Sequence, residues 1–187
     1  MLIQITKRII RVLLHEKIIT QEDVEVYEYG CQITLANIIN FIIVLTIGII
    51  FKSVIQSAIF YLSFISLRIF CGGYHANSYH KCFFIFGCTC SICILLGHFL
   101  EKVSILTFLS VGSIFLLGMA IYKKAPIEHE NRPFMEEERK KFRKKSFEVY
   151  VGWVIICSIF RIFGQFSYQA VLTMSFLAVL VLMMESK

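Results

Sequence analysis

The feature that most constrains this chain is a series of long segments without charged side chains. Three of them, residues 82–100, 103–122 and 165–184, contain no Asp, Glu, Lys or Arg. A helix needs about 20 apolar residues to cross the hydrocarbon core of a bilayer. Hydrophobic residues make up 57% of the chain, more than soluble domains usually hold. The sequence therefore predicts an all-α, polytopic membrane helix bundle.

Three further segments, residues 33–51, 53–67 and 149–160, bring the prediction to about six transmembrane helices. Cytoplasmic connections of membrane proteins carry the excess of Lys and Arg. With six spans, one side of the membrane receives most of the basic residues, and the other receives only Lys52, Lys102 and Arg161. The asymmetry predicts that the N- and C-termini are both cytoplasmic.

Two polar regions lie outside these spans in what we expect to be a single integral membrane domain, residues 1–187. Residues 1–30 are predicted to form a cytoplasmic helical region that begins with an amphipathic helix. Its apolar face suits the surface of an anionic leaflet, or equally the side of the bundle. Residues 123–148 form a basic cytoplasmic loop, whose second half is predicted to be helical and to lead into the fifth span.

The cysteines and the basic charge exclude several classes of protein. Seven cysteines, an odd number lying mostly in apolar runs, argue against a disulfide framework. Cys88, Cys90 and Cys93 are interpreted as small packing residues of a span. The basic clusters flank membrane spans and lack aromatic stacking positions, so we expect no nucleic-acid partner. We expect no metal and no cofactor either, because no complete ligand set is evident around the His and Cys residues.

Residues 68–82, with the sequence RIFCGGYHANSYHKC, form the segment that can carry chemistry. Ionisable residues at a membrane boundary are candidates for function. An imidazole can take the proton of a thiol, and the thiolate can attack a carbonyl carbon. On one helix, His75 and Cys82 would lie about 10.5 Å apart along the axis, so the chain must bend between them. Gly72 and Gly73 permit such a bend. On these residues alone, a catalytic pair, an incidental pair and a metal site all remain open.

The pattern Arg-x-Phe-x-Gly-Gly-x-His-Ala, followed by a Cys seven positions after the His, resembles the signature of the AgrB family. These are membrane peptidases of Gram-positive quorum-sensing systems. Residues 26–40 (VYEYGCQITLANIIN) and the basic loop also resemble the family, as do the chain length and the six-span layout. The resemblance implies that Cys82 is the nucleophile and His75 the general base. It places Arg68 and Gly73 at supporting positions, where Arg68 either binds the substrate or fixes the loop.

The resemblance further implies a cysteine endopeptidase in the cell membrane of a Gram-positive bacterium, with its active site on the cytoplasmic side. Its substrate would be an AgrD-like precursor peptide, cleaved through a thioester on Cys82 and closed into a thiolactone or lactone ring. A homodimer is also implied. The acidic tail of the precursor would be drawn to the cations of the basic loop, although ordinary membrane topology explains this run equally well. These cations are Arg139, Lys140, Lys141, Arg143, Lys144 and Lys145.

Two other classes of protein compete with this interpretation. A non-catalytic peptide exporter or transporter subunit would usually place charged or broken helices at mid-bilayer. The uncharged segments 82–100, 103–122 and 165–184 offer none. A metal-binding or redox membrane protein would need a fuller ligand set than the cysteines supply. Neither alternative accounts for a polar Gly-Gly-His…Cys segment between two spans.

Overall fold

The computed structural model of the chain describes residues 2–72, 79–103, 105–127 and 136–184. Helices dominate these residues and no strand occurs among them, which confirms the all-α prediction. The elements in chain order are α1 (Leu2–His15), the short 3-10 helix η1 (Gln21–Asp23), α2 (Val24–Ile50), α3 (Val54–Cys71), α4 (Tyr79–Leu100), α5 (Leu106–Lys124), α6 (Glu136–Ile162) and α7 (Phe166–Met184).

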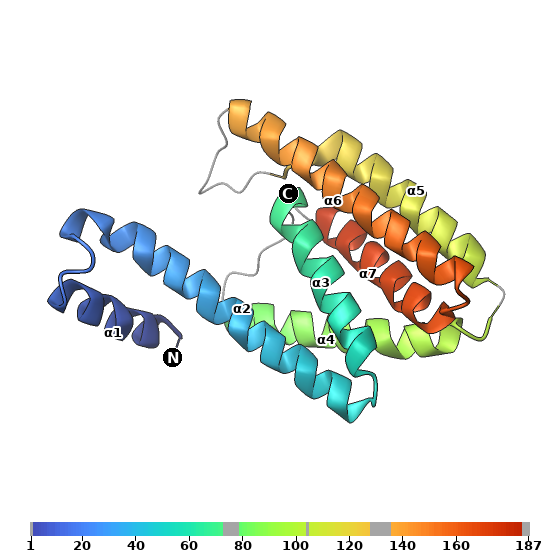
Figure 1. Cartoon of the computed structure of the whole chain (residues 1–187), viewed down its shortest axis with the longest axis horizontal. Helices are drawn as coiled ribbons and strands as arrows, with labels where there is room; N and C mark the ends of the chain where they lie inside the picture. The colour runs from blue at the N-terminus through green and yellow to red at the C-terminus, as the bar shows by residue number, and fades with distance from the viewer. Residues whose placement is uncertain (1, 73–78, 104, 128–135, 185–187) are drawn as a thin grey trace. The chain divides into compact units, whose positions relative to one another are not determined.

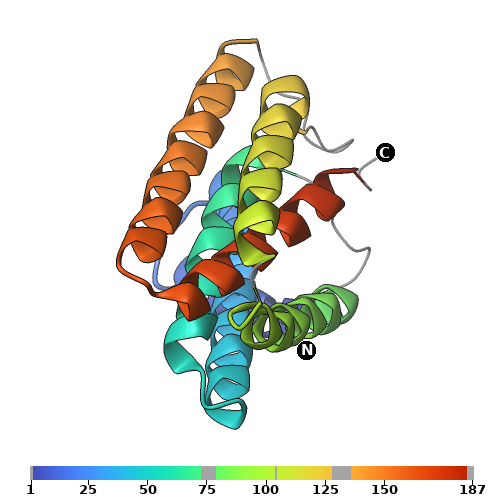
Figure 2. The ribbon, with the colours of Figure 1, turned by 90° about the vertical axis from the view of Figure 1, so that its right-hand side faces the viewer.

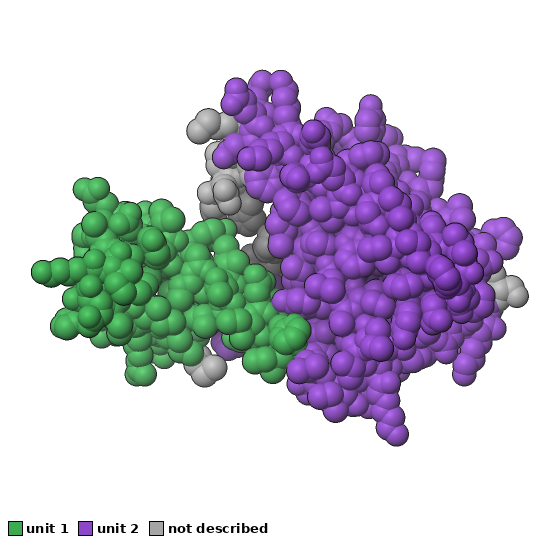
Figure 3. Space-filling model, viewed as in Figure 1, with its two compact units in different colours: residues 1–43 green, residues 44–187 purple. Residues whose placement is uncertain are grey.

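The chain divides into two compact units, Met1–Ile43 and Val44–Lys187 (Figure 3). In the first, the carboxylate of Asp23 accepts hydrogen bonds from the backbone N–H and the hydroxyl of Thr20, at 3.0 and 2.6 Å. This contact begins the helical run that continues through α2. Of the predicted apolar face of α1, Ile5 and Val12 are exposed, as contact with a leaflet would require. Its membrane contact stays a prediction, as does the single domain over residues 1–187.

The second unit is a bundle built around α7, which packs against α3, α4, α5 and α6 (Figures 1 and 2). Every residue of α7 from Gln169 to Phe176 is buried. A helix that is apolar on all sides is one that has neighbours on all sides. The uncharged composition of residues 165–184 therefore reflects a central place in the bundle as well as the capacity to cross a membrane.

Small polar residues connect α7 to its neighbours. Ser63 of α3 and Ser175 share a hydrogen bond of 2.7 Å between their hydroxyl oxygens. Ser110 of α5 pairs with Thr173 at 2.8 Å and accepts a hydrogen bond from the Gln169 amide at 2.9 Å. Lipid tails are as apolar as leucine, so membrane helices associate through close packing and such hydrogen bonds. These contacts set the register of α7 in the bundle.

Within the described residues, five helices are long and apolar enough to cross a membrane: the one over Gln21–Ile50, and α3, α4, α5 and α7. The predicted spans 82–100, 103–122 and 165–184 lie largely within three of them. The predicted fifth span, residues 149–160, lies in α6, whose first half is too highly charged for the whole helix to belong to this group. The span predicted over residues 149–160 and the cytoplasmic position of the termini stay predictions.

The packing of α4 on α7 gives a test of this bundle. A Cβ atom added at Gly97 would lie 2.7 Å from a γ-methyl group of Val171, whereas one added at Gly112 in α5 would meet no atom within 4 Å. We expect Gly97→Leu to cost about 1–3 kcal/mol of stability through overpacking. Gly112→Leu should leave stability unchanged or raise it slightly. Thermal unfolding of the two variants in the same detergent measures the difference, and equal melting temperatures would contradict the packing.

Candidate active site at Cys82

Cys82 lies near the start of α4, one turn after Tyr79, and its side chain is half-buried. The first turn of a helix presents backbone N–H groups that have no partner within the helix. Such groups can stabilise negative charge that develops near them during a reaction. The start of α4 therefore suits a reaction at Cys82, and the role of Cys82 as the nucleophile stays a prediction.

Arg68 approaches Cys82 from the last turn of α3. The two side chains line the same pocket and are close enough for a Coulombic interaction. The guanidinium also lies over the ring of Phe64, 5.9 Å from its centroid. That ring stacks on Phe60 at 5.2 Å and packs against Phe86 of α4 at 5.5 Å. A rigid aromatic contact between α3 and α4 thus holds the cation beside the thiol.

The pocket shared by Arg68 and Cys82 has otherwise mostly apolar walls. Its cavity volume is about 50 Å³. Besides the cation and the thiol, it is lined by Phe64, Ile85, Phe86, Thr89 and Leu182. Leu182 belongs to α7, so the central helix closes one side. Such a pocket can take an apolar side chain and keep water from a group that reacts at Cys82.

The C-terminus of α3 is held by residues from the basic segment that follows α5. The hydroxyl of Ser146 donates to the Phe70 carbonyl at 2.7 Å, and the N–H of Ile127 donates to the Cys71 carbonyl at 2.9 Å. The N–H of Gly72 donates to the Arg68 carbonyl at 3.0 Å. These bonds satisfy carbonyls that a helix end leaves open, and they fix the point from which the chain leaves α3.

Gly72 stands where only glycine fits. Its φ of 74° lies in the left-handed region, and a Cβ atom there would lie 2.5 Å from the carbonyl oxygen of Ile127. Both the backbone conformation and the close approach of another segment exclude a side chain. Gly72 thus ends α3 in a conformation that other residues rarely adopt, and its supporting role in catalysis stays a prediction.

His75 and Gly73 lie outside the described residues, so the predicted pairing of His75 with Cys82 stays a prediction. Sequence reasoning missed Ser146 and Ile127 as supports of the site. Both residues lie far from Cys71 along the chain, so nothing in the sequence indicates that they contact the end of α3. Among the residues that the structure describes, no three His, Cys, Asp or Glu side chains gather as a metal-binding group.

The predicted substrate-binding cations all lie on the exposed first half of α6, which continues into Ser146 and its contact with α3. The members are Arg139, Lys140, Lys141, Arg143, Lys144 and Lys145. Glu148 ends this basic run. Its carboxylate lies 3.0 Å from the Lys145 amine, and this hydrogen bond holds the pKa of Glu148 below its usual value.

The contact between Gly72 and Ile127 can be tested by adding one methyl group. We expect Gly72→Ala to destabilise the protein by about 1–3 kcal/mol, because it adds backbone strain and a clash. It should also change the rate at which Cys82 is alkylated, measured by mass spectrometry of the Cys82 peptide. Gly152→Ala is the control, since nothing lies within 4 Å of a Cβ atom at that helical position. A Gly72→Ala protein with wild-type stability and alkylation would show that the close approach has no structural consequence.

Comparisons with known proteins agree with the resemblance in the sequence. The family model of accessory gene regulator B (AgrB) matches residues 6–185. A protein of Clostridium perfringens strain SM101, described as AgrB-like, is 31% identical over 71% of this chain and 66% of its own length. An AgrB-like protein of Listeria innocua is 26% identical over 71% of this chain and 62% of its own. The chain thus spans less than two thirds of these relatives. No solved structure matches it significantly.

Proposed function

Because the chain belongs to the AgrB family, we propose that it is a membrane cysteine endopeptidase that processes a quorum-sensing peptide precursor. Family membership supports a part in the processing of such peptides. The observation that carries the finer proposal is the pocket in which the Cys82 thiol and the Arg68 guanidinium meet among apolar side chains. A nucleophile beside a fixed cation, in a pocket with few other polar groups, suits covalent catalysis.

In the proposed reaction, His75 takes the proton of the Cys82 thiol, and the thiolate attacks the carbonyl at the C-terminal edge of the future signal peptide. The carbon–nitrogen bond then breaks, and the leaving amine receives the proton from His75. The C-terminal tail departs and the remaining peptide is held as a thioester on Cys82. The backbone N–H groups at the start of α4 are suited to stabilising the oxyanion.

Ring closure follows by acyl transfer. A Cys or Ser side chain within the same peptide attacks the thioester, which closes a thiolactone or lactone and returns Cys82 to its thiol form. Exchange of a thioester for a thiolactone conserves the bond type, so this step needs no ATP. Water would divert the intermediate to a linear acid. The apolar walls contributed by Ile85, Phe86 and Leu182 limit that access.

The basic charge of α6 supports both the proposed partner and the proposed side of the membrane for the active site. The precursor would be an AgrD-like peptide with an acidic tail, attracted by the positive potential of the first half of α6. The basic residues lie at the end of the bundle where Ser146 contacts α3, which favours an active site on the cytoplasmic side of a Gram-positive cell membrane. Contact of α1 with the anionic leaflet and assembly as a homodimer belong to the same proposal.

Substitution of the proposed pair tests the enzyme directly. In liposomes that contain the protein and its precursor, Cys82→Ala should abolish release of the tail, because the nucleophile is lost. His75→Ala should slow release by about 10²–10⁴-fold, the usual contribution of a general base. Cys88→Ala removes an exposed thiol further along α4 and should retain activity. The readout is peptide mass, where the cyclic product is lighter than the linear segment by one water.

Two outcomes would contradict the proposal. Tail release by Cys82→Ala at the wild-type rate would remove Cys82 as the nucleophile and favour the non-catalytic exporter or transporter subunit. If the wild-type enzyme yields only the linear acid, the proposed peptidase activity stands, but the proposed ring closure by acyl transfer does not.

A further inference from the structure

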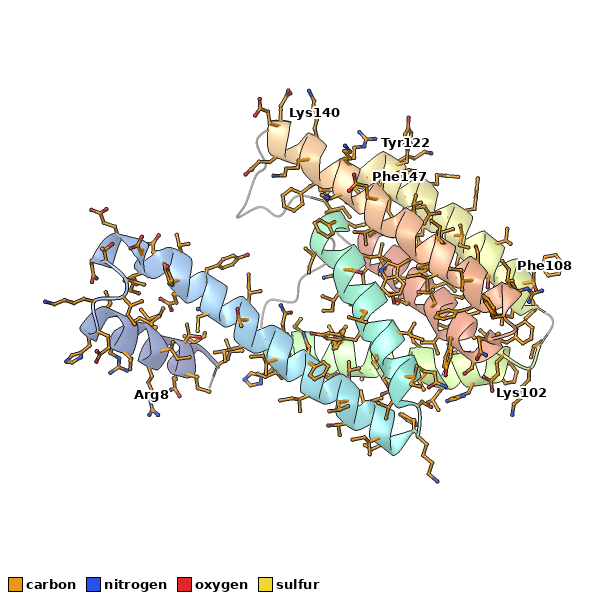
Figure 4. All side chains as sticks on the ribbon, in the orientation of Figure 1. Arg8, Lys102, Phe108, Tyr122, Lys140 and Phe147 are labelled. Atoms are coloured by element: carbon orange, nitrogen blue, oxygen red, sulfur yellow. The ribbon has the colours of Figure 1, made fainter. Side chains whose placement is uncertain are left out.

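A groove with cationic and aromatic walls lies between α5 and α6, away from the pocket at Cys82. It has a cavity volume of about 390 Å³. Figure 4 shows Tyr122, Lys140 and Phe147 gathered at this end of the two helices. The groove is lined by Ile121 and Tyr122 of α5 and by Lys140, Arg143, Lys144 and Phe147 of α6.

The spacing of the α6 residues places them on one face of the helix. Positions 140, 143, 144 and 147 follow the i, i+3, i+4, i+7 pattern of a single stripe. Three of the four are cations, and none of the described residues that line the groove is a carboxylate. Glu148, beyond this stripe, lies 3.0 Å from Lys145 and 4.0 Å from Lys144. The groove therefore carries a concentrated positive charge that suits an anion.

Arg143 is already fixed in place at the wall of this groove. Its guanidinium donates a hydrogen bond to the backbone carbonyl of Tyr122, near the C-terminus of α5. It also lies over the Tyr122 ring, 5.4 Å from the centroid. A cation held by two contacts loses little further freedom when an anion arrives.

The position along the helices places the groove at the boundary of a membrane. Helix α5 is long and apolar enough to span and ends at Lys124, so in a membrane Tyr122 would lie near one surface of the bilayer. Helix α6 changes from a charged half to an apolar half after Glu148, and the exposed ring of Phe147 lies beside that change. Aromatic rings are enriched at this depth, between headgroups and acyl chains.

We propose that this groove binds one anionic phospholipid. The phosphate would lie among Lys140, Arg143 and Lys144, and the glycerol and first acyl carbons would cover Tyr122 and Phe147. Basic pockets between membrane helices bind anionic headgroups in this way. The exposed apolar floor favours a lipid over an acidic peptide, which would use the cations alone. Arg139, Lys141 and Lys145 lie on the same half of α6 but do not line the groove.

The test compares two variants of the full chain that lose equal charge from the same helix. The groove variant is Lys140→Gln/Arg143→Gln/Lys144→Gln, and the control is Arg139→Gln/Lys141→Gln/Lys145→Gln. Each protein, purified in detergent, is titrated with phosphatidylglycerol or phosphatidylcholine, and lipid adducts are counted by native mass spectrometry. We expect the wild type and the control to retain one phosphatidylglycerol per chain. The groove variant should bind it at least about tenfold more weakly, since each basic side chain near a lipid surface contributes substantially.

Several results would overturn the proposal. Equal weakening in both triple variants would show diffuse attraction to the basic helix. Equal affinity for phosphatidylcholine would remove the role of the headgroup charge. Displacement of the lipid by equimolar inorganic phosphate or by an acidic peptide would assign the groove to those ligands. The exposed single variants Lys140→Gln and Lys144→Gln, checked by thermal unfolding, keep the test decisive if the triple variant fails to fold.

Discussion

The constraint on which this structure depends is that helices in a bilayer gain little by burying apolar surface against one another. The bundle must therefore be held by close approach and by hydrogen bonds. Helix α7 supplies both: Val171 fits against the backbone of Gly97, and hydroxyls on α7 pair with Ser63 and Ser110. Since α3, α4 and α5 all pack on α7, its register determines where the ends of α3 and α4 lie. The candidate active site is built at those two ends.

A second set of contacts connects the site to the basic segment. The last carbonyls of α3 accept hydrogen bonds from Ile127, which follows α5, and from Ser146, which lies within α6. The helix that carries the positive charge thus also supports the point where the predicted catalytic loop leaves α3. Under the proposed function, one element would attract the acidic tail of the precursor and stabilise the loop that cleaves it. The lipid proposed between α5 and α6 would lie along the same helix, on the face that carries Arg143.

The sequence predicted the helices best where a long segment contains no charged side chain. Residues 82–100 and 165–184 contain no charge, and they correspond closely to α4 and α7. The segment around Cys82 was identified because a thiol, an imidazole and glycines at a membrane boundary suggest chemistry, and the resemblance assigned their roles. The support by Ser146 could not be predicted, because a serine that bonds to a distant carbonyl looks like any other serine in a sequence. The pocket at Cys82 likewise depends on Leu182, a residue that only the packing of α7 brings there.

The proposed reaction depends above all on a thioester at Cys82, and direct observation of that thioester is the measurement of choice. A precursor whose ring-forming Cys or Ser is replaced by Ala can acylate the enzyme but cannot close a ring. Incubated with the protein in liposomes and quenched in acid, it should leave the N-terminal part of the peptide on Cys82. Intact-mass and peptide mapping would show this adduct, and hydroxylamine should remove it. Release of the tail without any adduct, or an adduct on another cysteine such as Cys88, would contradict the account.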